Sequence, residues 1–123
     1  MSVESEAIKY VIDYEEKANR NPHDVTKDKK HKGYDIICDD RVIEVKGRGK
    51  DKAPHILLNE NNIQAIQNKH PNKTYYLYVV MNPEHNPNLM IFSKEEVERR
   101  RQESRIWRIP LRKEDYSKKI LAK

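Results

Sequence analysis

The sequence is poor in cysteine and glycine and has no long apolar segment. Cys38 is the only cysteine among 123 residues, so a disulfide within the chain is excluded, as is usual in a reducing cytosol. No apolar stretch approaches the roughly 20 residues of a membrane-spanning helix, and the N-terminal segment has neither the basic nor the apolar part of a signal peptide. We therefore expect a soluble, cytoplasmic protein with no membrane partner.

Charged residues are abundant, at 37%, against 36% hydrophobic residues. At this length we expect a single domain over residues 1–123 with a modest core. Its net charge of +5 comes from a basic C-terminal extension, about 94–123, which holds 11 of the 25 Lys and Arg residues but only 6 of the 20 acidic ones. This excess favours a polyanionic partner, although a solvated surface is the more common explanation.

Hydrophobic periodicity predicts an α/β fold. Apolar residues share one face of a predicted helix over 2–18, and Glu15 takes the next position of that stripe. Residues 34–38 and 41–46 predict a β-hairpin, while 23–32 reads as a loop. The nearly continuous apolar run 74–81 is typical of a central strand. With further strands at 55–58, 89–92 and 106–111 and helices at 60–69, 93–103 and 115–121, we expect a mixed central β-sheet flanked by α-helices.

The side chains that suggest chemistry lie in the hairpin. Alternation along its second strand directs Glu44 and Lys46 to one face and Ile43 and Val45 to the other. A two-residue turn sets Asp35 opposite Glu44, about 5 Å away.

Two carboxylates this close repel each other, and a divalent cation relieves the repulsion. Mg²⁺ binds one or two carboxylates with other oxygen ligands, which the Val45 carbonyl could include. Glu15 could supply a third acid, and Lys46 could orient a water molecule or stabilise phosphate charge. A surface ion pair between Lys46 and either acid is the structural alternative. The five histidines are scattered without zinc-like spacing, and Cys38 is expected to be a core thiol.

Asp35, Glu44 and Lys46 match the D…E-x-K core of the PD-(D/E)-x-K nuclease superfamily, which has the restriction-endonuclease-like fold, although Tyr34 stands in place of the motif's Pro. The chain most closely resembles the protein NO VEIN C-terminal-like domain, a domain of unknown function often found at the end of helicase-like chains. Asn62 and Ile63 stand where that family has an acid followed by an aromatic residue. The matching segments are Tyr14-Glu15 with Arg20, Asp24-Val25, 33–36, 43–48, 58–65 and 76–80.

This resemblance implies a restriction-endonuclease-like fold, with Asp35 and Glu44 as metal ligands, Lys46 as the catalytic lysine and a role for Glu15. The hypothesis that follows is a Mg²⁺-dependent endonuclease, also served by Mn²⁺, that hydrolyses phosphodiester bonds of DNA. The residues expected to contact nucleic acid are Arg48, Lys50, Lys52, Arg99, Arg100 and Arg101.

Two other functions are compatible with the sequence. One is a catalytically silent module that binds nucleic acid or docks onto a helicase-like protein. The other is a structural subunit with an accidental motif, which predicts no affinity for nucleic acid. A homodimer is compatible with the nuclease hypothesis, because nucleases of this type often need two active sites to cut both strands.

Overall fold

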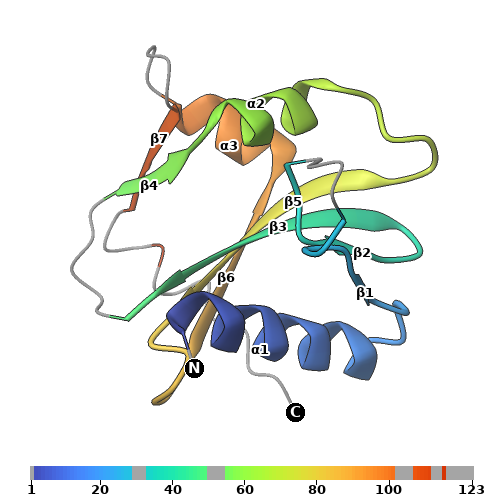
Figure 1. The fold of residues 1–123 in the computed structure, drawn as a ribbon. Helices are drawn as coiled ribbons and strands as arrows, with labels where there is room; N and C mark the ends of the chain where they lie inside the picture. The colour runs from blue at the N-terminus through green and yellow to red at the C-terminus, as the bar shows by residue number, and fades with distance from the viewer. Residues whose placement is uncertain (1, 29–32, 50–54, 102–106, 112–114, 116–123) are drawn as a thin grey trace.

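The computed structural model describes residues 2–28, 33–49, 55–101, 107–111 and 115, and these form three helices and seven strands (Figure 1). None of the described helices is long and apolar enough to cross a membrane. In chain order the elements are α1 (Val3–Lys17), β1 (His23–Asp24), β2 (Ile36–Ile37), β3 (Arg41–Arg48), β4 (His55–Leu58), α2 (Glu60–Gln67), β5 (Thr74–Met81), β6 (Asn88–Ser93), α3 (Lys94–Arg100) and β7 (Trp107–Pro110).

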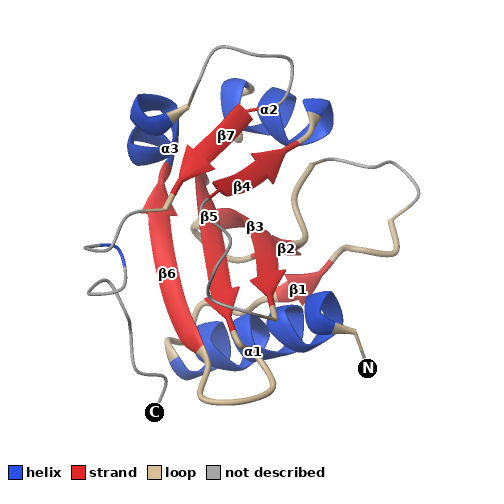
Figure 2. Cartoon of the chain, turned by 90° about the vertical axis from the view of Figure 1, so that its left-hand side faces the viewer, coloured by secondary structure: helices blue, strands red, loops and turns tan. Residues whose placement is uncertain are grey.

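Five strands form one mixed sheet in the order β1-β2-β3-β5-β6. The β3 and β5 strands run parallel at its centre, whereas every other pair in this sheet is antiparallel. The β4 and β7 strands pair separately as a small antiparallel sheet beside α2 and α3 (Figure 2). The predicted α/β architecture, a mixed sheet flanked by helices, is therefore confirmed.

The large sheet separates two apolar layers. On one face α1 packs through Ala7 and Val11 onto Ile43 and Val45 of β3. The other face carries the larger cluster, in which α2, α3 and the small sheet cover β5. Because both faces are covered, most of Thr74–Met81 is buried, as the continuous apolar run predicts.

Side-chain caps set the starts of all three helices. The side chains of Ser2, Asn59 and Ser93 accept backbone N–H groups in the first turns of α1, α2 and α3. The predicted helix starts are therefore correct. The helix predicted at 93–103 ends at Arg100, and the one predicted at 115–121 lies, apart from Asp115, outside the described residues.

Two expectations about the first part of the sheet are wrong. The predicted loop 23–32 begins with strand β1, a two-residue edge strand of polar side chains that periodicity cannot detect. The predicted strand 34–38 is reduced to Ile36–Ile37. Its register is nevertheless the expected one, since Ile36 faces Ile43 and the N–H of Cys38 donates to the Arg41 carbonyl at 2.8 Å.

Candidate active site

The candidate site lies where β3 extends beyond the end of its pairing with β2. No described strand pairs with β3 on the β2 side beyond Ile43, and we call the backbone of Val45–Gly47 on that side the open edge. Two acidic side chains bind its N–H groups in place of a strand. The N–H of Val45 donates to Asp35 Oδ2 at 2.8 Å, and that of Gly47 donates to Glu4 Oε1 at 3.3 Å. Acidic oxygens are therefore gathered at backbone positions that a neighbouring strand would otherwise occupy.

Asp35 reaches this edge because its backbone departs from regular antiparallel pairing with β3. Its N–H donates to the Ile43 carbonyl at 2.8 Å, so Asp35 is not paired with Glu44 as a regular hairpin would have it. The two residues still meet, through a hydrogen bond between their side chains. The predicted juxtaposition of Asp35 and Glu44 is thus present, but a bend before β2 produces it rather than strand pairing.

The bend is held in place by α2. Gly33 has φ +77°, and a Cβ atom there would lie 2.1 Å from the Asn61 carbonyl oxygen, so only glycine fits. Asn62, which is buried at 1% exposure, donates from Nδ2 to the Gly33 carbonyl at 3.1 Å. The start of α2 therefore fixes the backbone that delivers Asp35.

Glu44 is the most deeply buried acid of the site, with 6% of its surface exposed. Burial first, and then the charge of Asp35, raise its pKa to about 8. Burial also raises the pKa of Asp35, against the lowering effect of the Val45 N–H. Lys46 Nζ lies 3.3 Å from Glu44 Oε2 and partly offsets the negative charge. The two carboxyl groups therefore retain a proton near neutral pH unless a cation takes its place.

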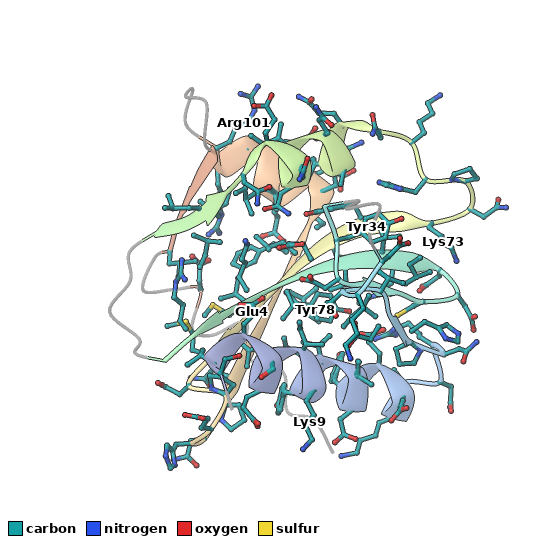
Figure 3. The ribbon with its side chains drawn as sticks, viewed as in Figure 1. Glu4, Lys9, Tyr34, Lys73, Tyr78 and Arg101 are labelled. Atoms are coloured by element: carbon teal, nitrogen blue, oxygen red, sulfur yellow. The ribbon has the colours of Figure 1, made fainter. Side chains whose placement is uncertain are left out.

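Glu4 is an acid of this site that the sequence reasoning missed. It lies in the first turn of α1 and reaches Gly47, beneath the C-terminal part of β3 (Figure 3). Glu4 as a residue is exposed, but partial burial of its carboxyl group against β3 raises its pKa most, and the neighbouring charge of Asp35 raises it further. The approach of α1 requires Gly47, because a Cβ atom there would lie 2.9 Å from that of Ala7. Gly47 thus makes room for α1.

Tyr75 is a second residue beside these acids that the sequence pattern did not place at the site. It lies beside Val42 on the neighbouring strand, and its side chain is on the same face of the sheet as that of Glu44. Only 2% of Tyr75 is exposed, and its hydroxyl has no hydrogen-bond partner among the described residues. Burial and the nearby charges of Glu44 and Asp35 raise its pKa. An unsatisfied buried hydroxyl beside two carboxyl groups is typical of a site that binds a further polar group.

The described residues contain no cluster of three His, Cys, Asp or Glu side chains arranged for a metal. The donor set nevertheless suits a hard cation such as Mg²⁺, which needs only one or two carboxylates when other oxygens complete its shell. Asp35 and Glu44 would be those ligands. The Val45 carbonyl would face the same edge as the Val45 N–H, since both groups of one strand residue point to the same side.

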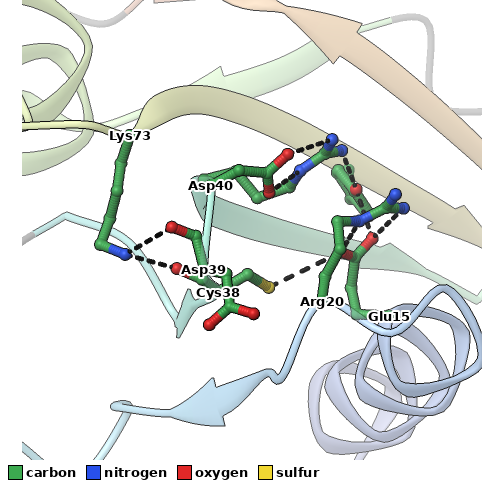
Figure 4. Close-up of polar contacts among 8 residues, drawn as sticks. Glu15, Arg20, Cys38, Asp39, Asp40 and Lys73 are labelled. Atoms are coloured by element: carbon green, nitrogen blue, oxygen red, sulfur yellow. Dashed lines mark hydrogen bonds and ion pairs between the residues drawn. The ribbon is translucent and has the colours of Figure 1, made fainter.

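Glu15 is not brought to this site. It is fully buried on the α1 face of the sheet, opposite the face of Glu44, and Figure 4 shows it close to Arg20 and Cys38. Its carboxylate accepts hydrogen bonds from Arg20 Nε at 2.5 Å, the Tyr78 hydroxyl at 2.5 Å and Cys38 Sγ at 3.6 Å. The expectation of Glu15 as a third acid at the site is therefore corrected: it anchors α1 to the sheet.

Cys38 belongs to the same buried network. Burial and the adjacent Glu15 carboxylate raise the pKa of its thiol to about 12, so it remains protonated. This agrees with the expected core thiol.

The basic residues expected to bind nucleic acid are dispersed. Arg48 lies at the end of β3 beside Glu4, while Lys50 and Lys52 lie outside the described residues. Arg100 donates to buried Asp115 at 2.6 Å and covers the Phe92 ring at 5.3 Å. Two neighbouring arginines, Arg99 and Arg101, are exposed at the end of α3. Any contact of these arginines with nucleic acid stays a prediction.

Comparison with known proteins identifies a family for this chain. The family described as Protein NO VEIN, C-terminal, has a model that matches residues 3–92. No curated protein and no solved structure matches the chain. The matched segment includes Glu4, Asp35, Glu44, Lys46 and Tyr75, and covers well over half of the sequence. The chain therefore belongs to the Protein NO VEIN, C-terminal family.

Proposed function

We propose that this protein is a Mg²⁺-dependent endonuclease that hydrolyses phosphodiester bonds of DNA, with Mn²⁺ as an alternative ion. The observation that carries the proposal is the pair of half-buried Asp35 and buried Glu44 at the open edge, with Lys46 3.3 Å from Glu44. One acid before β2, with a second acid and a lysine two residues apart on β3, is an arrangement similar to that of the PD-(D/E)-x-K nucleases. The choice of DNA over RNA rests on that similarity.

The metal, when bound, would polarise the scissile phosphate and lower the pKa of an attacking water. Asp35 and Glu44 would hold it, and the position of Asp35 is fixed by the Val45 N–H and by α2. Lys46 lies beside Glu44, where its ammonium group orients the water or stabilises charge on the phosphate. Glu4 extends the acidic edge toward Gly47, where it can accept a hydrogen bond from a second water.

Incubation of the purified protein with labelled single-stranded, double-stranded and branched DNA, in Mg²⁺, Mn²⁺ or EDTA, tests the proposal. Cleavage should require the metal and fall at least 100-fold in Asp35→Asn and Lys46→Ala, since even residues that only orient metal ligands contribute about 10- to 100-fold. Salt-sensitive binding of DNA in EDTA should persist in both variants. Binding without cleavage in any substrate would instead support the silent docking module.

A further inference from the structure

Two adjoining cavities form a groove between α2 and the start of β5. One, of about 380 Å³, is lined in part by Lys73, Tyr75 and Lys94, and the other, of about 290 Å³, by Tyr34 and Gln64. Asn68, Lys69 and His70 line both cavities, so the two lie side by side. This strand groove, as we call it, lies on the side of the molecule where Figure 3 labels Tyr34 and Lys73.

The charge of the strand groove is positive. Among the described residues that line it there are three lysines and no acidic side chain. Lys73 Nζ is already bound to the Cys38 and Asp39 carbonyls, at 2.6 and 3.0 Å. Lys69 and Lys94, in contrast, form no ion pair with any described residue. Lys94 also occupies the first turn of α3, where a cation is unfavourable to the helix dipole, so its position is not explained by helix stability.

Aromatic rings line the same groove. The His70 ring stacks on Tyr75 with centroids 6.4 Å apart, and Tyr34 meets His70 edge to face at 5.6 Å. Both Tyr34 and His70 are partly exposed. Free cations beside partly exposed rings are the combination that binds single-stranded nucleic acid, since phosphates pair with the cations and unstacked bases lie on the rings. In a duplex the bases are already stacked on one another and cannot use such rings.

The strand groove adjoins the candidate active site through two of its residues. Tyr34 immediately precedes Asp35, and Tyr75 lines the groove while the charges of Glu44 and Asp35 act on its phenol group. We propose that the strand groove binds a single-stranded segment of nucleic acid, with phosphates at Lys69 and Lys94 and a base against Tyr34 and His70. This inference rests on the proposed nuclease function and specifies its substrate: DNA with a single-stranded portion that leads to Asp35 and Glu44.

Fluorescence anisotropy with a labelled single-stranded oligonucleotide, in EDTA, tests the groove separately from catalysis. The double variant Lys69→Ala/Lys94→Ala should bind roughly 10-fold more weakly and reduce the salt slope by about 1.4, the value for two lost phosphate contacts on a single strand. A matched control, Lys9→Ala/Lys27→Ala, removes the same charge from exposed positions outside the groove and should change affinity less than 3-fold. Tyr34→Leu should weaken binding of the single strand by at least 5-fold through lost stacking.

Each of the other outcomes would contradict one part of the groove proposal or of the nuclease proposal. Equal losses in the groove and control variants would show that net charge alone matters, and tighter binding of a duplex competitor would contradict the single-strand assignment. The cleavage assay in Mg²⁺ separates the two proposals. If the groove variants lose binding while the wild type never cleaves, the groove stands and the nuclease proposal fails. If the wild type cleaves and the groove variants bind and cleave as well as it does, the groove proposal fails alone.

Discussion

Glu44 and Asp35 share a side-chain hydrogen bond at the open edge of β3, and this acidic pair is the reason we propose a cation there. Burial and the Asp35 charge raise the pKa of Glu44 from 4.5 to about 8. Full ionisation of both carboxyl groups in this buried position is unfavourable near neutral pH. A divalent cation can replace the proton, and this exchange connects stability, metal binding and catalysis in the predictions below.

The first prediction concerns pH in the absence of metal. Between about pH 4.5 and 8 the folded protein keeps the Glu44 proton that the unfolded chain has lost, so stability should fall as pH rises through this window. Thermal unfolding in EDTA should therefore show a Tm lower at pH 8 than at pH 5 by at least 4 °C, about 1 kcal/mol for this size. Glu44→Gln removes the titrating group and should reduce this difference. An unchanged pH dependence in Glu44→Gln would contradict the assignment.

The second prediction concerns metal binding. Saturating Mg²⁺ at pH 8 should raise the Tm of the wild type, because a ligand at 100 times its Kd stabilises the folded state by about 2.7 kcal/mol. Asp35→Asn and Glu44→Gln should show no such rise, whereas Glu15→Gln, altered on the opposite face of the sheet, should respond as the wild type does. A Mg²⁺ response that survives in Asp35→Asn would place the ion elsewhere.

The third prediction concerns the unsatisfied hydroxyl of Tyr75. Because a buried hydroxyl without a partner is destabilising by about 1–3 kcal/mol, Tyr75→Phe should leave the free energy of unfolding unchanged or increase it. The same variant should reduce metal-dependent cleavage about 10-fold if the hydroxyl binds a water or phosphate at the site. Urea unfolding and single-turnover cleavage measure the two effects. A loss of stability with full activity would show that the hydroxyl is only a packing group.

The fourth prediction separates Glu15 from the site. Arg20→Ala leaves the fully buried Glu15 carboxylate without its ion-pair partner and should lower the free energy of unfolding by about 3 kcal/mol. Tyr78→Phe removes one hydrogen bond to the same carboxylate and should lower it by about 1.5 kcal/mol. Both variants should keep wild-type cleavage at a temperature where they remain folded. Loss of cleavage in the folded Tyr78→Phe variant would restore a catalytic role for Glu15.

Local sequence rules were sufficient for most of the fold. Alternation correctly placed Glu44 and Lys46 opposite Ile43 and Val45, and the capping residues correctly marked where helices begin. The local rules failed where the role of a residue depends on partners that are distant in the sequence. Glu15 continues an apolar stripe, which shows that it is buried but cannot reveal Arg20 and Tyr78 around it.

The site itself was only partly predictable. Glu4 looks like any favourable acid in a first helical turn, and only the close approach of α1 to Gly47 brings it to the open edge. Asp35 was found by hairpin register, yet its position depends on a bend that α2 holds through Gly33. Tyr75 belongs to a continuous apolar run, and nothing in that run distinguishes its hydroxyl from those of its neighbours.

A comparison of the wild type with Glu44→Gln decides whether Glu44 belongs to a metal-dependent nuclease site. Single-turnover cleavage of DNA with a single-stranded portion would be measured for the wild type and Glu44→Gln, in Mg²⁺ and in EDTA, with binding measured in EDTA. We predict cleavage by the wild type in Mg²⁺ only, at least a 100-fold loss in Glu44→Gln, and equal binding by both proteins. Equal cleavage by the two proteins, or cleavage that persists in EDTA, would contradict the account.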